Sequence, residues 1–241
     1  MNKVIHYFWF GKNPKPKIFK TCLKSWKKYL PDWEIKEWTE ENCDVYINEF
    51  TTYAYKTKNW SFISDFYRCY VLEKYGGLYL DIDVELIGSI DDLLKKEKPF
   101  LGFESTGLVN SGLIMYFPNP HNLLLKEMLK IVESKSSVIG EHFAKTTIVA
   151  WLTEELQKNN LVNDNSFQSV MGIDIYPSDY FCPVSPTWKH QNFTSNTRSI
   201  HHYFASWIDK KSRDEIRFKR FIFKALHPIN YLKVLYRRHI S

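Results

Sequence analysis

The sequence has few of the residues that mark several protein classes. Its four cysteines (Cys22, Cys43, Cys69, Cys182) are widely separated and form no C-x-x-C pair. This argues against zinc ribbons and disulfide frameworks and favours a reducing cytoplasm. With 9 glycines and 10 prolines in 241 residues, the chain is neither collagen-like nor of low complexity. It also carries no P-loop or dinucleotide-binding glycine fingerprint.

Long apolar runs are missing as well. No uninterrupted apolar segment approaches the roughly 18 to 20 residues of a membrane-spanning helix. No charged-then-apolar leader precedes Val4, so we expect no signal peptide. Apolar residues are nevertheless plentiful, because hydrophobic residues make up 44% of the chain and aromatic residues 17%. The composition therefore predicts a large core and excludes disorder as a description of the whole.

Positive charge is concentrated at one end of the chain. Residues 209–241 hold ten Lys and Arg against three acids, whereas the whole chain has a net charge of +6, which leaves the preceding 208 residues at −1. This distribution argues against a protein that binds nucleic acid over its whole surface. It divides the chain into a body, residues 1–208, and a basic tail, residues 209–241.

Hydrophobic periodicity predicts strands that alternate with helices along the body. Gly76-Gly77 is predicted to end the second helix. The alternation is typical of an α/β sandwich with a mainly parallel central sheet. The strands are expected at 4–10, 33–38, 78–86, 99–104, 111–117 and 199–204, and the helices at 18–30, 61–75, 119–133 and 141–158.

The strand expected at 78–86 carries two carboxylates, Asp81 and Asp83, on one face. Carboxylates among apolar residues are costly to bury without a positive partner, and oxygen ligands of this kind suit Mg²⁺ or Mn²⁺. In open α/β sheets, ligands bind beyond the carboxyl ends of the strands. The pattern therefore indicates either a metal site or a solvated edge strand.

A second charged pair lies on the preceding helix. Asp65 and Arg68 are three residues apart and share one helix face. They form either an ordinary surface ion pair or a pair directed at the same cleft as Asp81 and Asp83. In the second case, the carboxylate and the guanidinium would bind sugar hydroxyls or a phosphate.

Three separated motifs resemble those of one family of sugar transferases. SDFYRCYVLEKYGGLYLDID (64–83) resembles its S-D-x-x-R … G-G-x-Y-x-D-x-D signature. IHYFWFG (5–11) is similar to its I-H-x-x-W-x-G opening, and IHHYFASW (200–207) to its closing H-x-x-x-x-S-W. The family includes bacterial capsule and lipopolysaccharide glycosyltransferases, yeast initiating mannosyltransferases and the clostridial glucosylating toxins. Residues 84–198 match it only loosely.

The resemblance implies a GT-A fold, which is a Rossmann-like nucleotide-sugar-binding α/β fold. It implies a metal-dependent hexosyltransferase that uses Mn²⁺ or Mg²⁺, takes its sugar from a nucleotide donor, expected to be a UDP-sugar, and retains the anomeric configuration. The expected acceptor is a saccharide, lipid-linked, in bacterial capsule or lipopolysaccharide synthesis. Double displacement and front-face attack both stay open, because the sequence names no unambiguous nucleophile.

The same resemblance implies roles for individual residues. Asp83 is the direct metal ligand, Asp81 contacts the ribose and the metal or its water, and His201, in preference to the neighbouring His202, faces the metal or diphosphate. Asp65 and Arg68 bind hydroxyls of the donor sugar. The other donor-binding residues are Trp9 against the base, Ser64 near the ribose, Asn110 at a sugar hydroxyl, and Ser206 and Trp207 in a closing loop that contacts the metal and the glycosidic oxygen. Asp65, Arg68, Asp83 and Trp207 form the expected catalytic set.

Three of these residues also have purely structural interpretations. Trp9 and Trp207 would equally serve as core tryptophans, and Asn110 as a turn residue.

The tail is predicted to form a pair of basic amphipathic helices, interrupted at His227-Pro228. Phe218, Phe221, Ile222, Ala225 and Leu226 recur at helical spacing, with basic residues on the other faces. Such a helix suits an anionic membrane surface, which would make the protein cytoplasmic and peripheral on the inner face of the membrane. The alternative is a terminal helix that packs on the body with its charges in solvent.

Two other functions fit parts of the pattern. A sugar-phosphate nucleotidyltransferase also uses Mg²⁺ and acids on an α/β sheet, but GKNPKPK (11–17) fits poorly with the Gly-rich, Arg-containing loop of such enzymes. The other is a non-catalytic membrane- or carbohydrate-binding protein with a degenerate site. The intact set of Asp65, Arg68, Asp81 and Asp83 argues against it.

Overall fold

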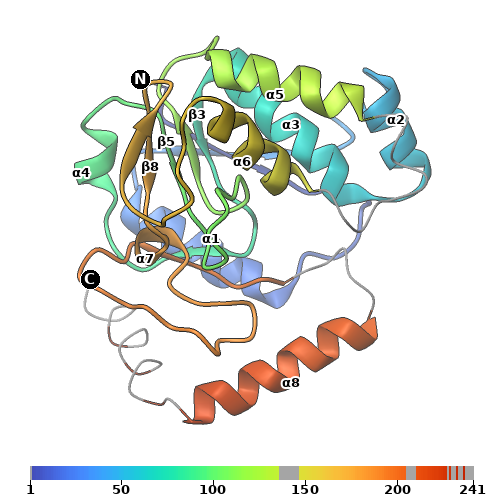
Figure 1. Cartoon of the computed structure of the whole chain (residues 1–241). Coiled ribbons are helices and arrows are strands. Elements are labelled where there is room, and N and C mark those ends of the chain that lie inside the picture. Colours follow the sequence, from blue (N-terminus) through green and yellow to red (C-terminus); the bar gives the residue numbers. More distant parts are fainter. Residues whose placement is uncertain are drawn as a thin grey trace.

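The structure is a computed structural model that describes residues 2–135, 147–204 and 210–226, together with residues 228, 232 and 236. Within these residues the chain forms a mixed α/β fold around a seven-stranded sheet, with helices on both faces (Figure 1). The expected α/β class is therefore confirmed.

The strand order of the large sheet is β2-β1-β3-β6-β5-β8-β7. Five of its seven strands run in one direction, as predicted for a mainly parallel sheet. β6 and β7 run antiparallel to their neighbours. The strands are β1 (Val4–Phe8), β2 (Glu34–Trp38), β3 (Gly77–Tyr79), β5 (Phe100–Gly102), β6 (Met115–Phe117), β7 (Gln168–Val170) and β8 (Ile173–Tyr176).

Two helical layers bury the faces of this sheet in separate hydrophobic clusters. Along β1, Ile5 and Tyr7 belong to one cluster and Phe8 to the other, as the alternation of side chains across a strand requires. The Phe8 side is covered by α2 (Glu49–Lys56), α3 (Trp60–Tyr75), α5 (Leu123–Ser134) and α6 (Ile148–Lys158). The Ile5 side is covered by α1 (Lys17–Tyr29), α4 (Asp91–Leu94) and α7 (Ser178–Phe181).

The prediction of one continuous strand over 78–86 is wrong. β3 ends at Tyr79, and the chain turns between Asp81 and Val84, where the Val84 N–H donates to the Asp81 carbonyl at 3.0 Å. β4 (Val84–Leu86) then pairs antiparallel with β9 (Ser199–His201) in a separate two-stranded sheet. Asp81 and Asp83 therefore lie on a turn between two strands and not within a regular strand.

The ends of several other elements differ from the expectation. The helix expected at 119–133 begins at Leu123, because the Asn122 side chain caps it by accepting from the Leu124 N–H at 2.9 Å. The helix expected at 141–158 is described as α6, capped by Thr147, and residues 141–146 lie outside the described residues. The strand expected at 199–204 ends at His201.

The turn from α3 into β3 is held by His6 of β1. The His6 Nδ1 accepts from the Trp38 indole N–H at 3.1 Å, so its Nε2–H donates to the Gly76 carbonyl at 3.0 Å. Gly77 has a φ of +107°, and a Cβ there would lie 2.8 Å from the Val4 carbonyl and 2.9 Å from His6 Nε2. The turn thus requires glycine, and it directs β3 toward Asp81.

His6 makes the stability of the fold dependent on pH. Burial lowers its pKa to about 4, whereas an unfolded histidine titrates near 6.5. Between these values the unfolded chain binds more protons, so the stabilisation is lost as the pH falls. Between pH 7 and pH 5, the free energy of unfolding is expected to fall by about 2 kcal/mol more in the wild-type chain than in His6→Gln. The measurement is urea denaturation of both proteins at the two pH values. Equal losses in both proteins would contradict this role.

Candidate active site

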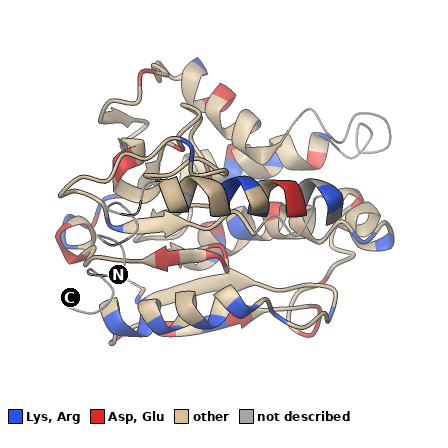
Figure 2. Ribbon diagram, turned by 90° about the horizontal axis from the view of Figure 1, so that it is seen from below, with Lys and Arg blue, Asp and Glu red and all other residues tan. Residues whose placement is uncertain are grey.

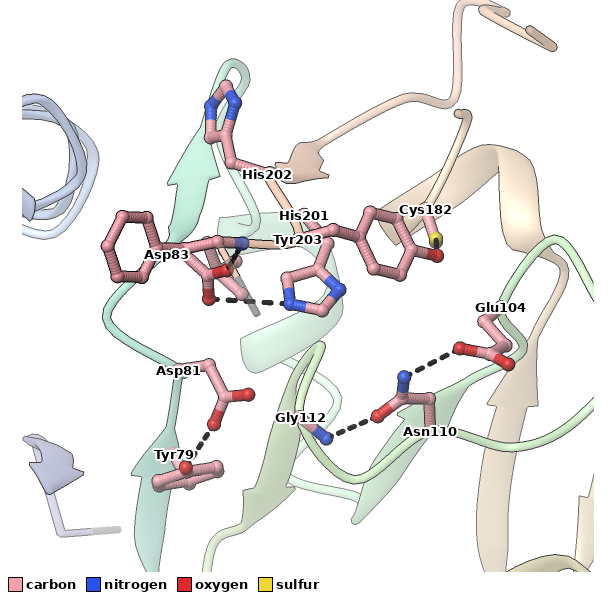
Figure 3. Close-up of polar contacts among 12 residues, drawn as sticks. Tyr79, Asp81, Asp83, Glu104, Asn110, Gly112, Cys182, His201, His202 and Tyr203 are labelled. Carbon is pink, nitrogen blue, oxygen red and sulfur yellow. Dashed lines mark hydrogen bonds and ion pairs between the residues drawn. The ribbon is translucent and has the colours of Figure 1, made fainter. Parts of the chain in front are cut away.

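Polar side chains from distant parts of the sequence meet beside the turn between β3 and β4 (Figure 3). Asp81 and Asp83 lie on the turn, and His201 ends β9, which pairs with β4 through a Val84–His201 register. One ligand atom from each of the three residues lies within 4.8 Å of the other two. The structure therefore brings the three expected metal ligands together.

Asp83 is buried and held as a carboxylate. Its Oδ1 lies 3.3 Å from His201 Nε2, and its Oδ2 accepts the Phe204 N–H at 2.6 Å. Burial alone would raise the pKa of Asp83, but the nearby His201 and the Phe204 amide outweigh burial and lower it to about 2. Asp83 is therefore ionised at neutral pH.

The two neighbouring histidines face different partners. His202 Nε2 bonds Glu85 Oε2 at 2.7 Å in a buried pair, and Figure 3 shows its ring turned away from Asp81. His201 faces Asp83, and its ring lies 4.2 Å from that of Tyr203. Among the described residues, the buried Nδ1 of His201 has no hydrogen-bond partner. His201, and not His202, is thus placed at the carboxylates.

Arg68 of α3 connects the carboxylates of the turn with Asp65, which also lies on α3. Its guanidinium lies 2.9 Å from Asp65 Oδ1 and 3.5 Å from Asp81 Oδ1. It also donates to the Ser111 hydroxyl at 3.1 Å and lies 4.8 Å from the centre of the Tyr79 ring. Asp65 is 7% exposed and Arg68 5%, so the surface ion pair that the spacing allowed is excluded.

The carboxylates differ in how easily they ionise. Burial raises the pKa of Asp65 to about 6, although the Arg68 charge opposes the rise. Burial also raises the pKa of Asp81, where Arg68 lowers it and the Asp83 charge raises it further. The Tyr79 hydroxyl holds Asp81 through a hydrogen bond to Oδ1. The Asp83 charge thus opposes ionisation of the half-buried Asp81 at the same turn, and a cation between the two carboxylates would remove the conflict.

These donors fit a divalent metal. Carboxylate oxygens suit Mg²⁺ and Mn²⁺, and an imidazole nitrogen is acceptable to Mn²⁺. The Nε2 of His201, which faces Asp83 at 3.3 Å, and the carboxylates of Asp81 and Asp83 are the ligand atoms that such an ion would take. The site residues therefore fit the cofactor that the resemblance implies.

Asn110 lies across from the turn, on the segment that precedes β6 (Figure 3). Its Nδ2 donates to Glu104 Oε2 at 2.7 Å, and its Oδ1 accepts the Gly112 N–H at 2.7 Å. A Cβ on Gly112 would lie 2.5 Å from Asp81 Oδ2 and 3.1 Å from Asn110 Oδ1. The backbone at Gly112 therefore approaches Asp81 so closely that any side chain at this position would have to displace the Asp81 carboxylate.

The remaining expected donor-binding residues are placed less completely. Trp9 follows β1, is half-buried, and donates its indole N–H to the Asn13 carbonyl at 2.6 Å. None of the described hydrophobic clusters includes it, so the core interpretation of Trp9 is not supported. The Ser64 hydroxyl bonds the Trp60 carbonyl at 3.2 Å, and the Ser64 carbonyl accepts from Arg68 Nε at 3.3 Å. Ser206 and Trp207 lie outside the described residues.

Sequence reasoning missed four contributors to the site: Tyr79, Glu104, Ser111 and Phe204. Tyr79 stands inside the G-G-x-Y-x-D-x-D motif, and its place there was the available signal. Glu104 follows β5 near the carboxyl end of that strand, where ligands gather in α/β sheets. No sequence pattern distinguishes Ser111, whose hydroxyl accepts from Arg68, and Phe204 contributes only its backbone N–H.

Comparisons with known proteins bear on the same region. Residues 16–100 match the family model described as the glycosyltransferase sugar-binding region containing DXD motif. Inositol phosphoceramide mannosyltransferase 3 of Schizosaccharomyces pombe is 30% identical over 132 residues, which are 52% of this chain and 35% of that protein. Inositol phosphoceramide mannosyltransferase 1 of the same organism is 30% identical over 105 residues, which are 39% of this chain and 31% of that protein. The chain thus spans about a third of the length of these relatives.

A solved structure supports the fold. PaToxG glycosyltransferase superposes with a TM-score of 0.53 at 16% identity, over 66% of this chain and 70% of that one. The similarity confirms the expected GT-A fold. The family match confirms the resemblance from which the site was predicted. The region at residues 16–100, which carries Asp65, Arg68, Asp81 and Asp83, is therefore similar to the sugar-binding region of DXD-type glycosyltransferases.

Proposed function

We propose that the protein is a metal-dependent, retaining glycosyltransferase. It would move a hexose from a nucleotide sugar, expected to be a UDP-sugar, to a saccharide acceptor in bacterial capsule or lipopolysaccharide synthesis. One observation carries the proposal: the buried Arg68 bridges Asp65 and Asp81 at 2.9 and 3.5 Å. It thereby links a pair suited to sugar hydroxyls with a group suited to a metal.

Asp81, Asp83 and His201 would hold Mn²⁺ or Mg²⁺. When bound, a divalent cation neutralises charge on a departing nucleoside diphosphate in a site with little water, an effect worth several kcal/mol. The chain orients these ligands before the donor binds. Asp83 is fixed by the Phe204 amide and His201, and Asp81 by the Tyr79 hydroxyl and Arg68.

Asp65 and Arg68 would bind hydroxyls of the donor sugar. Both are buried, and Ser111 together with the Tyr79 ring fixes the plane of the guanidinium. A preorganised pair of this kind holds the anomeric carbon in one position for attack. Trp9, Ser64 and Asn110 would complete the donor site, together with Ser206 and Trp207.

The proposed acceptor is lipid-linked. The names of the S. pombe relatives describe mannosyltransferases of inositol phosphoceramide, which is a lipid. The family match covers the region that holds Asp65, Arg68, Asp81 and Asp83, and it favours a glycosyltransferase over a sugar-phosphate nucleotidyltransferase.

The basic tail would place the enzyme at the membrane. α8 (Lys210–Leu226) lies along the underside of the molecule, the side from which Figure 2 is seen. Phe218, Phe221 and Leu226 are 65, 72 and 63% exposed on it. No described helix has both the length and the apolarity to cross a bilayer. Exposed aromatic rings on a basic helix fit the interface of an anionic bilayer, and we propose peripheral attachment to the inner face of the cytoplasmic membrane.

The role of Asp83 is tested by Asp83→Asn. Loss of the ionised ligand is expected to reduce Mn²⁺-dependent release of nucleoside diphosphate, assayed over a panel of UDP- and GDP-sugars, by at least about 100-fold. Asp164→Asn removes an exposed loop carboxylate and serves as the matched control. Wild-type turnover by the Asp83→Asn protein in the presence of a chelator would contradict the proposal.

The close approach of Gly112 to Asp81 gives a second test. A Cβ at 2.5 Å from Oδ2 must displace the carboxylate, so Gly112→Ala is expected to weaken Mn²⁺ binding by about tenfold or more. The measurement is the Mn²⁺ dependence of the thermal transition. In Gly88→Ala the nearest contact would be 3.3 Å, and it lies with the Thr197 carbonyl. Gly88→Ala is expected to bind Mn²⁺ as the wild type does. Equal weakening of Mn²⁺ binding in Gly112→Ala and Gly88→Ala would contradict the steric explanation.

Membrane attachment is tested with Phe218→Ser/Phe221→Ser. Removal of two exposed rings is expected to lower sedimentation with vesicles that contain anionic lipid by at least about tenfold in partition coefficient. The control is Val162→Ser/Phe167→Ser, which removes two exposed apolar side chains that lie outside α8. If the α8 variant and the wild-type chain sediment equally, α8 does not bind the membrane.

A further inference from the structure

Arg220 of α8 contacts the segment that follows His201. Its Nη1 donates to the His202 carbonyl at 2.6 Å, and its Nη2 lies 3.4 Å from the Tyr203 carbonyl. The same guanidinium donates to the Pro186 carbonyl from Nε at 3.2 Å and from Nη2 at 2.9 Å. A guanidinium can satisfy several carbonyls at once because its five N–H donors have a fixed geometry.

Two of these carbonyls, those of His202 and Tyr203, lie on either side of a residue with an unfavourable backbone conformation. Tyr203 has a φ of +46°, a left-handed conformation that is costly for a bulky side chain and persists only where its surroundings hold it. The His202 carbonyl precedes Tyr203 and the Tyr203 carbonyl follows it, so Arg220 bonds the peptide groups on both sides.

The second of these peptide groups also reaches the metal-binding carboxylate. It consists of the Tyr203 carbonyl and the Phe204 N–H, and the Phe204 N–H donates to Asp83 Oδ2 at 2.6 Å. One peptide group therefore lies between the Arg220 guanidinium and the Asp83 carboxylate. A cation on the carbonyl polarises the group and makes its N–H a stronger donor.

We infer that Arg220 is a positioning residue for Asp83: it holds Tyr203 in its left-handed conformation and thereby aims the Phe204 N–H at the carboxylate. The inference rests on the proposed function in one respect, that the task of Asp83 is to bind a metal. It makes α8, which belongs to the basic tail, a part of the active-site scaffold.

α8 also has an attachment that does not involve Arg220. Phe223 packs against the cluster of Ile87, Val184, Trp188 and Ile200, and Arg217 lies 5.7 Å from the Phe204 ring centre. Removal of the Arg220 charge is therefore expected to leave the helix docked, so that positioning can be separated from docking.

The test compares Arg220→Gln with Arg220→Lys in the full chain. Without metal, hydrogen exchange of the Phe204 amide is expected to be at least about tenfold faster in Arg220→Gln, because the peptide group that carries this N–H is no longer aimed at Asp83. The Mn²⁺ dissociation constant, measured from the spin-resonance signal of the free ion, is expected to rise about tenfold. Arg220→Lys is expected to recover part of both effects. Lys219→Gln, which removes a charge on the same helix paired with Glu215 at 2.6 Å, is expected to change neither.

Wild-type exchange at Phe204 in Arg220→Gln would overturn the inference, and so would a loss of thermal stability without any change in Mn²⁺ affinity. If the wild-type chain binds no Mn²⁺, the proposed function fails, whereas the exchange comparison still decides whether Arg220 positions the segment. If Arg220→Gln does not fold, Arg220→Lys replaces it, since lysine keeps the charge but not the fork of donors. In that case, wild-type exchange at Phe204 in Arg220→Lys overturns the inference.

Discussion

The buried guanidinium of Arg68 is the constraint on which the site depends. A cation that is 5% exposed needs partners, and Asp65, Asp81 and Ser111 supply them. Removal of any one would leave a buried charge poorly compensated, so α3, the turn after β3 and the segment before β6 must meet at one place. The geometry of the proposed active site and the packing of the fold are thus enforced by the same ion pairs.

Two sets of contacts around the Arg68 guanidinium hold the backbone that carries the carboxylates. His6 ties β1 to the glycine turn that starts β3, and the small β4–β9 sheet delivers the Phe204 amide and the His201 ring to Asp83. The first set uses His6 of the opening motif, and the second uses His201 and Phe204 of the closing motif. The segments that carry these motifs therefore contain residues that hold the backbone of the site, in addition to the residues proposed to bind the metal and the donor.

Much of the architecture was predictable from the sequence, and the failures have two causes. The α/β class, α3 with its glycine stop, and the grouping of Asp65, Arg68, Asp81, Asp83 and His201 followed from periodicity and from the motifs. The break after Tyr79 did not, because Leu78, Leu80, Val84 and Leu86 stay buried in one cluster and preserve the apolar alternation across the turn. Phe204 and Ser111 were missed because a backbone amide or a lone hydroxyl becomes significant only through tertiary contacts.

The distance in sequence between the turn at 81–83 and β9 has a consequence for biosynthesis. Asp81 and Asp83 leave the ribosome long before His201 and the amide of Phe204. A nascent chain therefore displays the acidic turn without its imidazole and without the strand that pairs with β4. The proposed capture of an ion and of a nucleotide therefore has to await synthesis of β9 and Phe204, so that the proposed donor site is completed well after the acidic turn has been made.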